Sequence, residues 1–105
     1  MHLRVSSPGA RLKDGEVDRI EKDLQKIDRR LRQFNEVSAE VRINGGDAGA
    51  PNHHVTLELQ YGRNHLIAKS EGADVGVAVR EAREEILRQI NDRSRGSHSE
   101  YSKHA

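Results

Sequence analysis

The sequence has no cysteine and no tryptophan, and its aromatic residues are two tyrosines and one phenylalanine. Without cysteine the chain has no disulfide, no thiolate nucleophile and no thiolate metal ligand, and this absence favours a reducing compartment. So few aromatic side chains cannot form a platform on which the bases of a single-stranded nucleic acid stack. These absences exclude several function classes before any pattern is considered.

Long hydrophobic runs are also missing. No apolar stretch approaches the roughly 20 residues of a membrane-spanning helix, and the N-terminus, Met1 to Val5, lacks the apolar region of a secretory signal. We therefore expect a cytoplasmic protein without a membrane partner. The net charge is only +1, so any case for nucleic-acid binding depends on where the charges lie.

The 105 residues fit one domain, and their apolar residues are periodic. Alternation of polar and apolar residues predicts four strands, at residues 2–6, 37–43, 54–61 and 65–71. In the last strand, either Leu66 and Ala68 or His65 and Ile67 point inward. A spacing of three and four predicts a helix from about Asp14, its first-turn acid or N-cap, to Phe34. Its apolar stripe is Val17, Ile20, Leu24, Ile27, Leu31 and Phe34.

A second helix is predicted from the N-cap Asp74 to an end between Asn91 and Arg95. Its buried face consists of Val75, Ala78, Val79, Ala82, Ile86 and Ile90. The order β-α-β-β-β-α predicts an α+β two-layer sandwich, in which two helices pack on one face of a four-stranded, mostly antiparallel sheet. Residues 1–95 form this domain, and residues 96–105, rich in Ser and His, are expected to be a disordered tail.

The first helix carries a second pattern, away from its apolar stripe. Because each residue turns the helix by about 100°, a group of cations is centred roughly 140° from the stripe. We call this group the cationic ridge, and its members are Arg19, Lys22, Lys26, Arg29 and Arg30. Arginine binds phosphate bidentately and lysine adds a charge with long reach, so the ridge suits a polyanion.

An ordinary solvated face is the competing interpretation of the ridge. Cations are favoured near a helix C-terminus, and Asp18 can pair with Lys22. However, Lys22 with Lys26 and Lys26 with Arg30 are like charges four residues apart, and each pair is unfavourable by about 0.2–0.5 kcal/mol. From this pattern alone the two interpretations are equally well supported. The mixed charges of the second helix favour an ordinary surface.

No motif predicts a catalytic or metal site. Alternation places His53 and His54 on opposite faces, which leaves too few ligands for a metal. The loop from Gly45 to Gly49 opens no helix and lacks the Lys-Ser/Thr of a phosphate-binding loop. Glu40, Glu58 and Glu71 are solvated acids on strands. We therefore expect no enzyme activity, no cofactor, no metal and no small-molecule substrate.

The order of elements and particular stretches resemble the ribosome hibernation-promoting factors, also called the ribosome-associated inhibitor or sigma-54 modulation family. The stretches are Arg19 to Ile27, Asp74 to Ala78, and Ile86 to Ile90, and the resemblance covers about residues 1–95. The given sequence is without the extra C-terminal domain of longer members, and so it resembles the short form of the family. The chain departs from the family at Gly76, where an aromatic is usual, and at Glu85 and Asn91-Asp92, where basic residues are usual.

The resemblance implies a protein that binds 16S rRNA of the small ribosomal subunit through basic residues on both helices. It implies inhibition of translation in stressed or stationary-phase cells, because such proteins occupy the mRNA and tRNA channel. Lys22, Lys26 and Arg29 look like the family's basic sites on the first helix, and Arg88 like one on the second. The RNA-binding residues predicted in this way are Arg19, Lys22, Lys26, Arg29, Arg30, Arg80, Arg83 and Arg88.

Two alternatives stay open. One is a protein-interaction module of the same fold with a weakened RNA site, which the acids Glu81, Glu84, Glu85 and Asp92 motivate. It predicts a protein partner, or weak self-association through the exposed sheet face or an edge strand. The other is binding to a different structured RNA, which the same ridge would suit.

Overall fold

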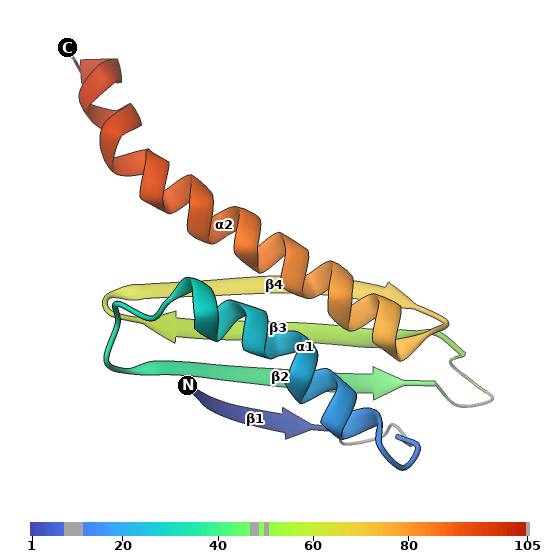
Figure 1. Cartoon of the computed structure of the whole chain (residues 1–105). Coiled ribbons are helices and arrows are strands. Elements are labelled where there is room, and N and C mark those ends of the chain that lie inside the picture. Colours follow the sequence, from blue (N-terminus) through green and yellow to red (C-terminus); the bar gives the residue numbers. More distant parts are fainter. Residues whose placement is uncertain (8–11, 47–48, 50, 105) are drawn as a thin grey trace.

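The structure, a computed structural model, describes residues 1–7, 12–46, 49 and 51–104, and for residues 95–104 it describes the backbone alone. The elements are β1 (His2–Ser6), α1 (Glu16–Arg30), β2 (Val37–Gly45), β3 (His53–Tyr61), β4 (Asn64–Gly72) and α2 (Val75–His104). Both helices lie on one face of a single sheet (Figure 1). The predicted α+β fold and its β-α-β-β-β-α order are confirmed.

The strands lie side by side in chain order, from β1 to β4. Strands β2, β3 and β4 are antiparallel neighbours, whereas β1 pairs with β2 in parallel because α1 crosses over between them. The turn between β3 and β4 is short, since Tyr61 already pairs with Asn64. Its first residue, Gly62, has a φ of 57°, which glycine adopts without the steric cost of a side chain.

The core fills the space between the sheet and the two helices. Leu24, Ile27, Leu57 and Ile86 are fully buried there, and they come from α1, β3 and α2. On β4, Leu66 and Ala68 face this core, which settles the alternative that the sequence left open for that strand. His65, Lys69 and Glu71 of the same strand face outward, so one face of the sheet is apolar and the other is mostly polar, with Ile67 as an exposed apolar exception.

Helix α1 differs from the expected helix at both ends. It begins at Glu16 after Gly15, whose φ is 85°, and no side chain caps it, so Asp14 is not the N-cap. Its apolar stripe is buried from Ile20 to Leu31, but Val17 in the first turn is 38% exposed. Phe34 lies beyond the helix and half-buried, where its ring packs edge-on against Tyr61 at 4.9 Å between centroids.

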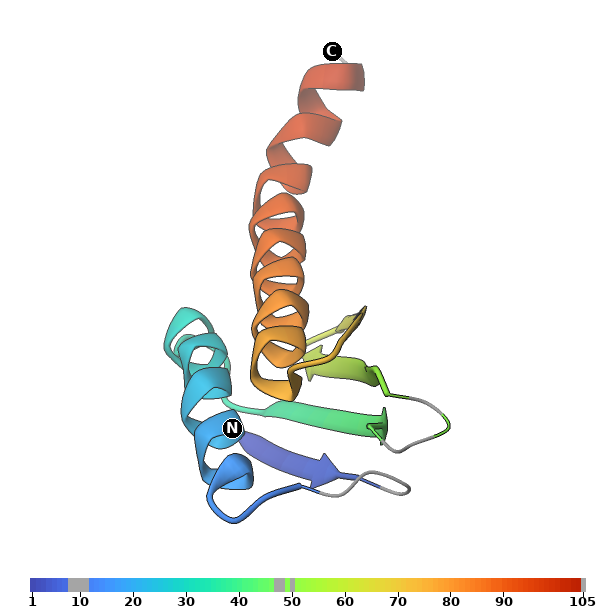
Figure 2. The ribbon, with the colours of Figure 1, turned by 90° about the vertical axis from the view of Figure 1, so that its right-hand side faces the viewer.

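Helix α2 begins as predicted, because Oδ1 of Asp74 accepts a hydrogen bond from the Val77 amide at 3.2 Å. All six residues of its predicted face are buried. The predicted end between Asn91 and Arg95 is wrong, since the helix continues to His104. No proline interrupts this stretch, so backbone hydrogen bonds can propagate along it. Its last turns project beyond the sheet (Figures 1 and 2).

Among the described residues, neither helix combines the length with the apolar composition that crossing a membrane requires.

Candidate nucleic-acid interface

The two helices run side by side in the same direction over the sheet (Figures 1 and 2). Side chains join them at two points. Near the middle, the Arg83 guanidinium pairs with Asp23 of α1 and, at 2.5 Å, with Glu84. Near the C-terminal end of α1, Nε and Nη2 of Arg30 donate to Oδ1 of Asn91 at 3.2 and 2.9 Å. These contacts fix α1 and α2 relative to each other, so charges on them form one rigid surface.

The cationic ridge lies on the outer side of α1. Its five members are exposed, and four of them, Arg19, Lys22, Lys26 and Arg29, have no ion pair or side-chain hydrogen bond within the described ranges. The fifth, Arg30, bonds only to a neutral amide and therefore keeps its charge available. The ridge is thus a row of cations that form no ion pair within the described ranges, although Asp18 lies one turn from Lys22.

Two acids of α1, Glu21 and Asp28, lie on the flank toward β1. There they line one pocket together with Arg29, at the border of the ridge. There, Asp28 lies 3.4 Å from the N-terminal amine of Met1. The charges of α1 are therefore partly separated by face, so a chain with a net charge of +1 can present a surface on which cations outnumber acids.

The three arginines predicted on α2 have three different environments. Arg80 is exposed and unpaired as far as the structure describes the chain. The Arg83 side chain is only 4% exposed and points toward Asp23. Arg88 is exposed but donates to both oxygens of Glu85, from Nε at 2.9 Å and from Nη2 at 2.6 Å. Hydrogen bonds from Arg88 and Gln89 lower the pKa of Glu85, so this carboxylate stays ionised and offsets the charge of Arg88.

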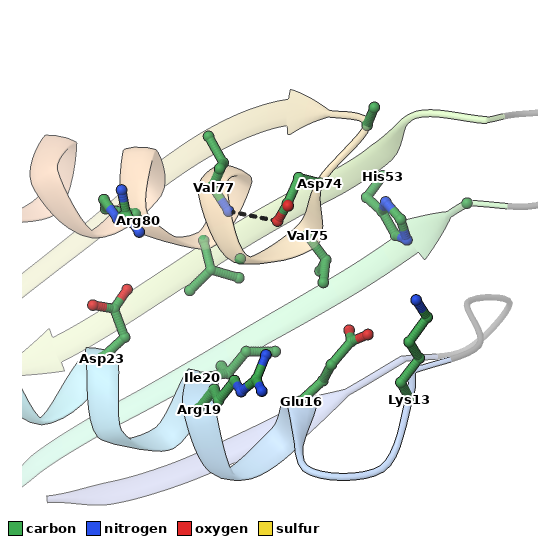
Figure 3. A pocket seen from close by; sticks show the side chains of 14 residues that line it. Lys13, Glu16, Arg19, Ile20, Asp23, His53, Asp74, Val75, Val77 and Arg80 are labelled. Carbon is green, nitrogen blue, oxygen red and sulfur yellow. Dashed lines mark hydrogen bonds between the residues drawn. The ribbon is translucent and has the colours of Figure 1, made fainter.

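A pocket opens between the N-terminal halves of the two helices (Figure 3). It is lined by cations that the sequence analysis did not connect, Lys13 before α1, Arg19 on α1 and Arg80 on α2. Acids also line it, among them Glu16 and Asp74. Only the proximity of two helix starts, which are distant in sequence, brings these residues together, so no local pattern predicts the pocket.

The outer face of the sheet carries mixed charges in pairs. His54 lies 3.6 Å from Glu71, His65 contacts Glu58, and Arg4 lies 3.9 Å from Glu40. Within the described part of the chain, no three histidine or acidic side chains gather in a way that would hold a metal ion. This face therefore offers no row of unpaired cations comparable with the ridge.

The arrangement as a whole suits binding of an extended polyanion. Rigid cations spaced along a helix can neutralise successive phosphates, and this binding follows the shape of the backbone. Sequence analysis found the ridge from its spacing alone. It missed that Arg83 is directed inward, although Arg83 follows Val79 by four residues and precedes Ile86 by three, a spacing typical of the buried stripe.

Comparisons with known proteins agree with this fold. The structure is similar to the Thermus thermophilus Protein Y N-terminal domain, with a TM-score of 0.71 and 21% identity, covering 86% of this chain and 96% of that one. It is also similar to a ribosomal subunit interface protein from Coxiella burnetii, with a TM-score of 0.70 and 16% identity, covering 90% and 98%. None of the curated proteins matches the chain. Residues 3–96 match the family described as sigma 54 modulation protein / S30EA ribosomal protein, so the chain belongs to this family.

Proposed function

We propose that this protein binds 16S rRNA of the small ribosomal subunit and inhibits translation by occupying the mRNA and tRNA channel in stressed or stationary-phase cells. Family membership supports a ribosome-associated role. The observation that carries the RNA part is the exposed, unpaired row of cations on α1. The protein acts as a binding protein in the cytoplasm, without a cofactor and without catalysis.

The physical basis is electrostatic. Guanidinium groups form bidentate hydrogen bonds with phosphate, and each contact releases counterions from the RNA. The ridge is held on a helix whose position is fixed by contacts with α2, so the backbone that carries the cations does not have to be ordered on binding. This kind of surface recognises the shape of a folded RNA backbone rather than a base sequence.

The contacts that we propose come mainly from α1, with Arg80 as the contribution of α2. The burial of Arg83 argues against a direct contact with RNA, and its role is to hold α1 in place. Arg88 reaches solvent, but Glu85 competes with phosphate for its guanidinium. The α2 half of the interface is therefore weaker than the set of eight basic residues suggests.

Charge reversal on the ridge tests this proposal. The double variant Lys26→Glu and Arg29→Glu should fold normally, because both side chains are exposed. It should lose co-sedimentation with small ribosomal subunits at low salt, whereas wild-type association should weaken steeply as salt rises. The measurement is a sucrose gradient with purified subunits over a range of salt concentrations.

The matched control is Arg42→Glu with Lys69→Glu, which makes the same charge change on the outer face of the sheet. This variant should still bind. If the ridge variant co-sediments as well as the wild type, the ridge is not the contact. Competition with another structured RNA in the same experiment separates the ribosome from an unrelated RNA target.

A protein-interaction module is the second candidate, and a specific observation favours it. Of the three arginines predicted on α2, two are occupied by acids, and Glu81 adds an exposed negative charge on the same helix. This candidate predicts no salt-sensitive association with ribosomes. Sedimentation of the purified protein would instead reveal self-association, or binding to a protein partner.

A further inference from the structure

The pocket between the N-terminal halves of α1 and α2 has a volume of about 670 Å³. This lies within the range of small-molecule sites and can hold a nucleotide. Buried apolar side chains line part of it, namely Ile20, Val75 and Val79. We call it the helix-end pocket, and Figure 3 shows the side chains that surround it.

The pocket contains unpaired charges of both signs. Lys13, Arg19 and Arg80 have no ion pair within the described ranges, and neither does Glu16. Asp23 also lines the pocket, but its carboxylate is already paired with the guanidinium of Arg83. A ligand with only negative groups would meet carboxylates, and a ligand with only hydrogen-bond donors would meet cations. The charges therefore fit a ligand that has an anionic group at one end and donors at the other.

The charges are ordered along the pocket. Arg19 ends the first turn of α1, Arg80 lies in the second turn of α2, and the two line opposite walls. Glu16 and Asp74 lie nearer the helix starts, with Lys13 beside Glu16. Asp23 lies at the arginine end, where Arg83 already pairs with it. Oδ1 of Asp74 is taken by the Val77 amide, which leaves Oδ2 free to accept from a ligand. The arginine end suits a phosphate and the carboxylate end suits a group that donates hydrogen bonds.

His53 is an independent observation at the same place. It extends from the start of β3 into the lining and packs against Gly46 so closely that a Cβ there would lie 2.3 Å from the imidazole Nε2. Its buried Nδ1 has no hydrogen-bond partner in the described part of the chain. Buried polar atoms are nearly always hydrogen-bonded, so an unpartnered one beside a pocket is a group that a ligand can satisfy.

We propose that the helix-end pocket binds a single nucleotide whose base carries an exocyclic amino group. The phosphate lies between Arg19 and Arg80, and the base lies over the apolar lining with its amino group toward Glu16 and Asp74. Carboxylates accept hydrogen bonds from such amino groups, as they do from N4 of cytosine, and they repel the carbonyl oxygen that uracil has in its place.

The nucleotide can come from two sources, a free mononucleotide or one residue extruded from a bound RNA strand. Arg19 belongs both to the pocket and to the cationic ridge, so a strand that follows the ridge reaches the pocket directly. The RNA source rests on the proposed function, whereas the free source does not. Proteins commonly recognise single-stranded RNA by binding bases that are splayed out of the stack.

Cytidine and uridine 5′-monophosphate are matched probes, because their bases differ only on the edge at positions 3 and 4. Cytosine has an amino group at position 4 and an acceptor at N3, whereas uracil has a carbonyl at position 4 and a single N–H donor at N3. Titration of each into the full chain is followed through the backbone amide signals of Gly46, Val75 and Gly76. Cytidine monophosphate should bind about fivefold or more tightly than uridine monophosphate. The double variant Glu16→Gln and Asp74→Asn should remove this preference while keeping the helix cap, since asparagine also caps helices.

Short oligocytidine and oligouridine strands form the second arm, and the same preference should appear if the residue comes from RNA. If cytosine is preferred over uracil only among the strands, the nucleotide comes from RNA. If cytosine is preferred only among the mononucleotides, the ligand is a free nucleotide. Arg80→Gln should weaken both probes, and Glu81→Gln, an exposed acid outside the pocket, should change neither. Equal binding of the cytosine and uracil probes in both arms overturns the proposal.

The test of the cytosine preference can fail independently of the test of ribosome binding. The ridge variant Lys26→Glu with Arg29→Glu should weaken both oligonucleotides equally and keep their ratio. If ribosome binding is lost with this variant while no preference for cytosine exists, the interface stands and the pocket proposal fails.

Discussion

Three arginines on α2 show that residue type alone does not determine whether a side chain is free to bind RNA. Arg80, Arg83 and Arg88 look alike in the sequence, and all three were predicted to contact RNA. In the structure Arg80 is unpaired among the described residues, Arg83 is buried and Arg88 is held by Glu85. Sequence can predict which residues are cationic, and the spacing of Arg83 within the buried stripe could have indicated its inward direction. Its pairing with Asp23 depends on how α1 packs against α2, which local patterns do not encode.

The buried Arg83 leads to a prediction about stability. Asp23→Ala should destabilise the fold by about 3 kcal/mol, because it leaves a buried guanidinium with Glu84 as its one remaining acid among the described side chains. Arg83→Met should cost less, about 1 kcal/mol, since methionine fills the space and Asp23, 24% exposed, can reach water. Urea unfolding of the two variants tests this order, and a larger loss for Arg83→Met would contradict it.

Glu85 leads to a prediction about RNA affinity. Glu85→Gln should free Arg88, increase affinity for RNA several-fold and steepen the dependence on salt by about one further phosphate contact. The control Glu81→Gln removes the same charge from α2 without releasing an arginine. If both variants gain equally, general repulsion rather than release of Arg88 explains the effect. Filter binding over a range of salt concentrations measures both.

The same pair has a defined pH dependence. The pKa of Glu85 is lowered in the folded protein, so its carboxylate is ionised at neutral pH and remains so into acid conditions. The pair therefore contributes fully above the ordinary pKa of glutamate, and this contribution is lost as pH falls through the lowered value. Neutral pH consequently does not release Arg88, and substitution is needed to do so.

At the scale of elements, periodicity predicts what is buried and does less well with where a helix begins and ends. The three-four spacing of α1 correctly predicts burial from Ile20 to Leu31, because a helix against a sheet must bury one stripe. It fails at Val17 and Phe34, where the chain passes the edge of the packed region. Asp14 resembles a cap in sequence, but the left-handed turn at Gly15 decides the start of α1.

Gly15 gives the prediction at this scale. Gly15→Ala should destabilise the protein by about 1–2 kcal/mol, because its φ of 85° is costly for a residue with a Cβ. An added Cβ would meet nothing within 4 Å, so the cost is one of backbone conformation alone. Gly15→Asn should cost less, since asparagine tolerates this region. Equal denaturation midpoints for the glycine and alanine proteins would contradict the argument.

For the whole molecule, sequence reasoning predicts the architecture and the cationic ridge but not the surface between the helices. Each strand and helix has its own local pattern, and packing both helices on the apolar face of the sheet buries all the apolar faces together. The helix-end pocket and the Asp23–Arg83 pair join residues far apart in the chain. Their positions follow from the angle and register of the two helices, which periodicity leaves undetermined.

The boundary of the domain is a prediction at this scale. Ile90 is the last core residue of α2, and the final turns project beyond the sheet (Figure 2). A chain ending at Arg95 should therefore keep its denaturation midpoint and its ribosome binding, since short unsupported helical ends fray. Amides of residues 96–104 should exchange rapidly in the full chain. A clear loss of stability on truncation would show that this segment belongs to the domain.

One contact of α2 bears on how the sheet could grow. Nε2 of Gln89 donates to the carbonyl of Ile67 at 3.1 Å, so α2 occupies a hydrogen-bonding group on the outer strand β4. At the opposite border, no described segment lies beyond β1 (Figure 1). Polymerisation by strand addition needs two open borders on every molecule. Because one outward-facing carbonyl of β4 is already taken, we expect any sheet extension to use β1, and to end at a closed pair rather than continue into a fibril.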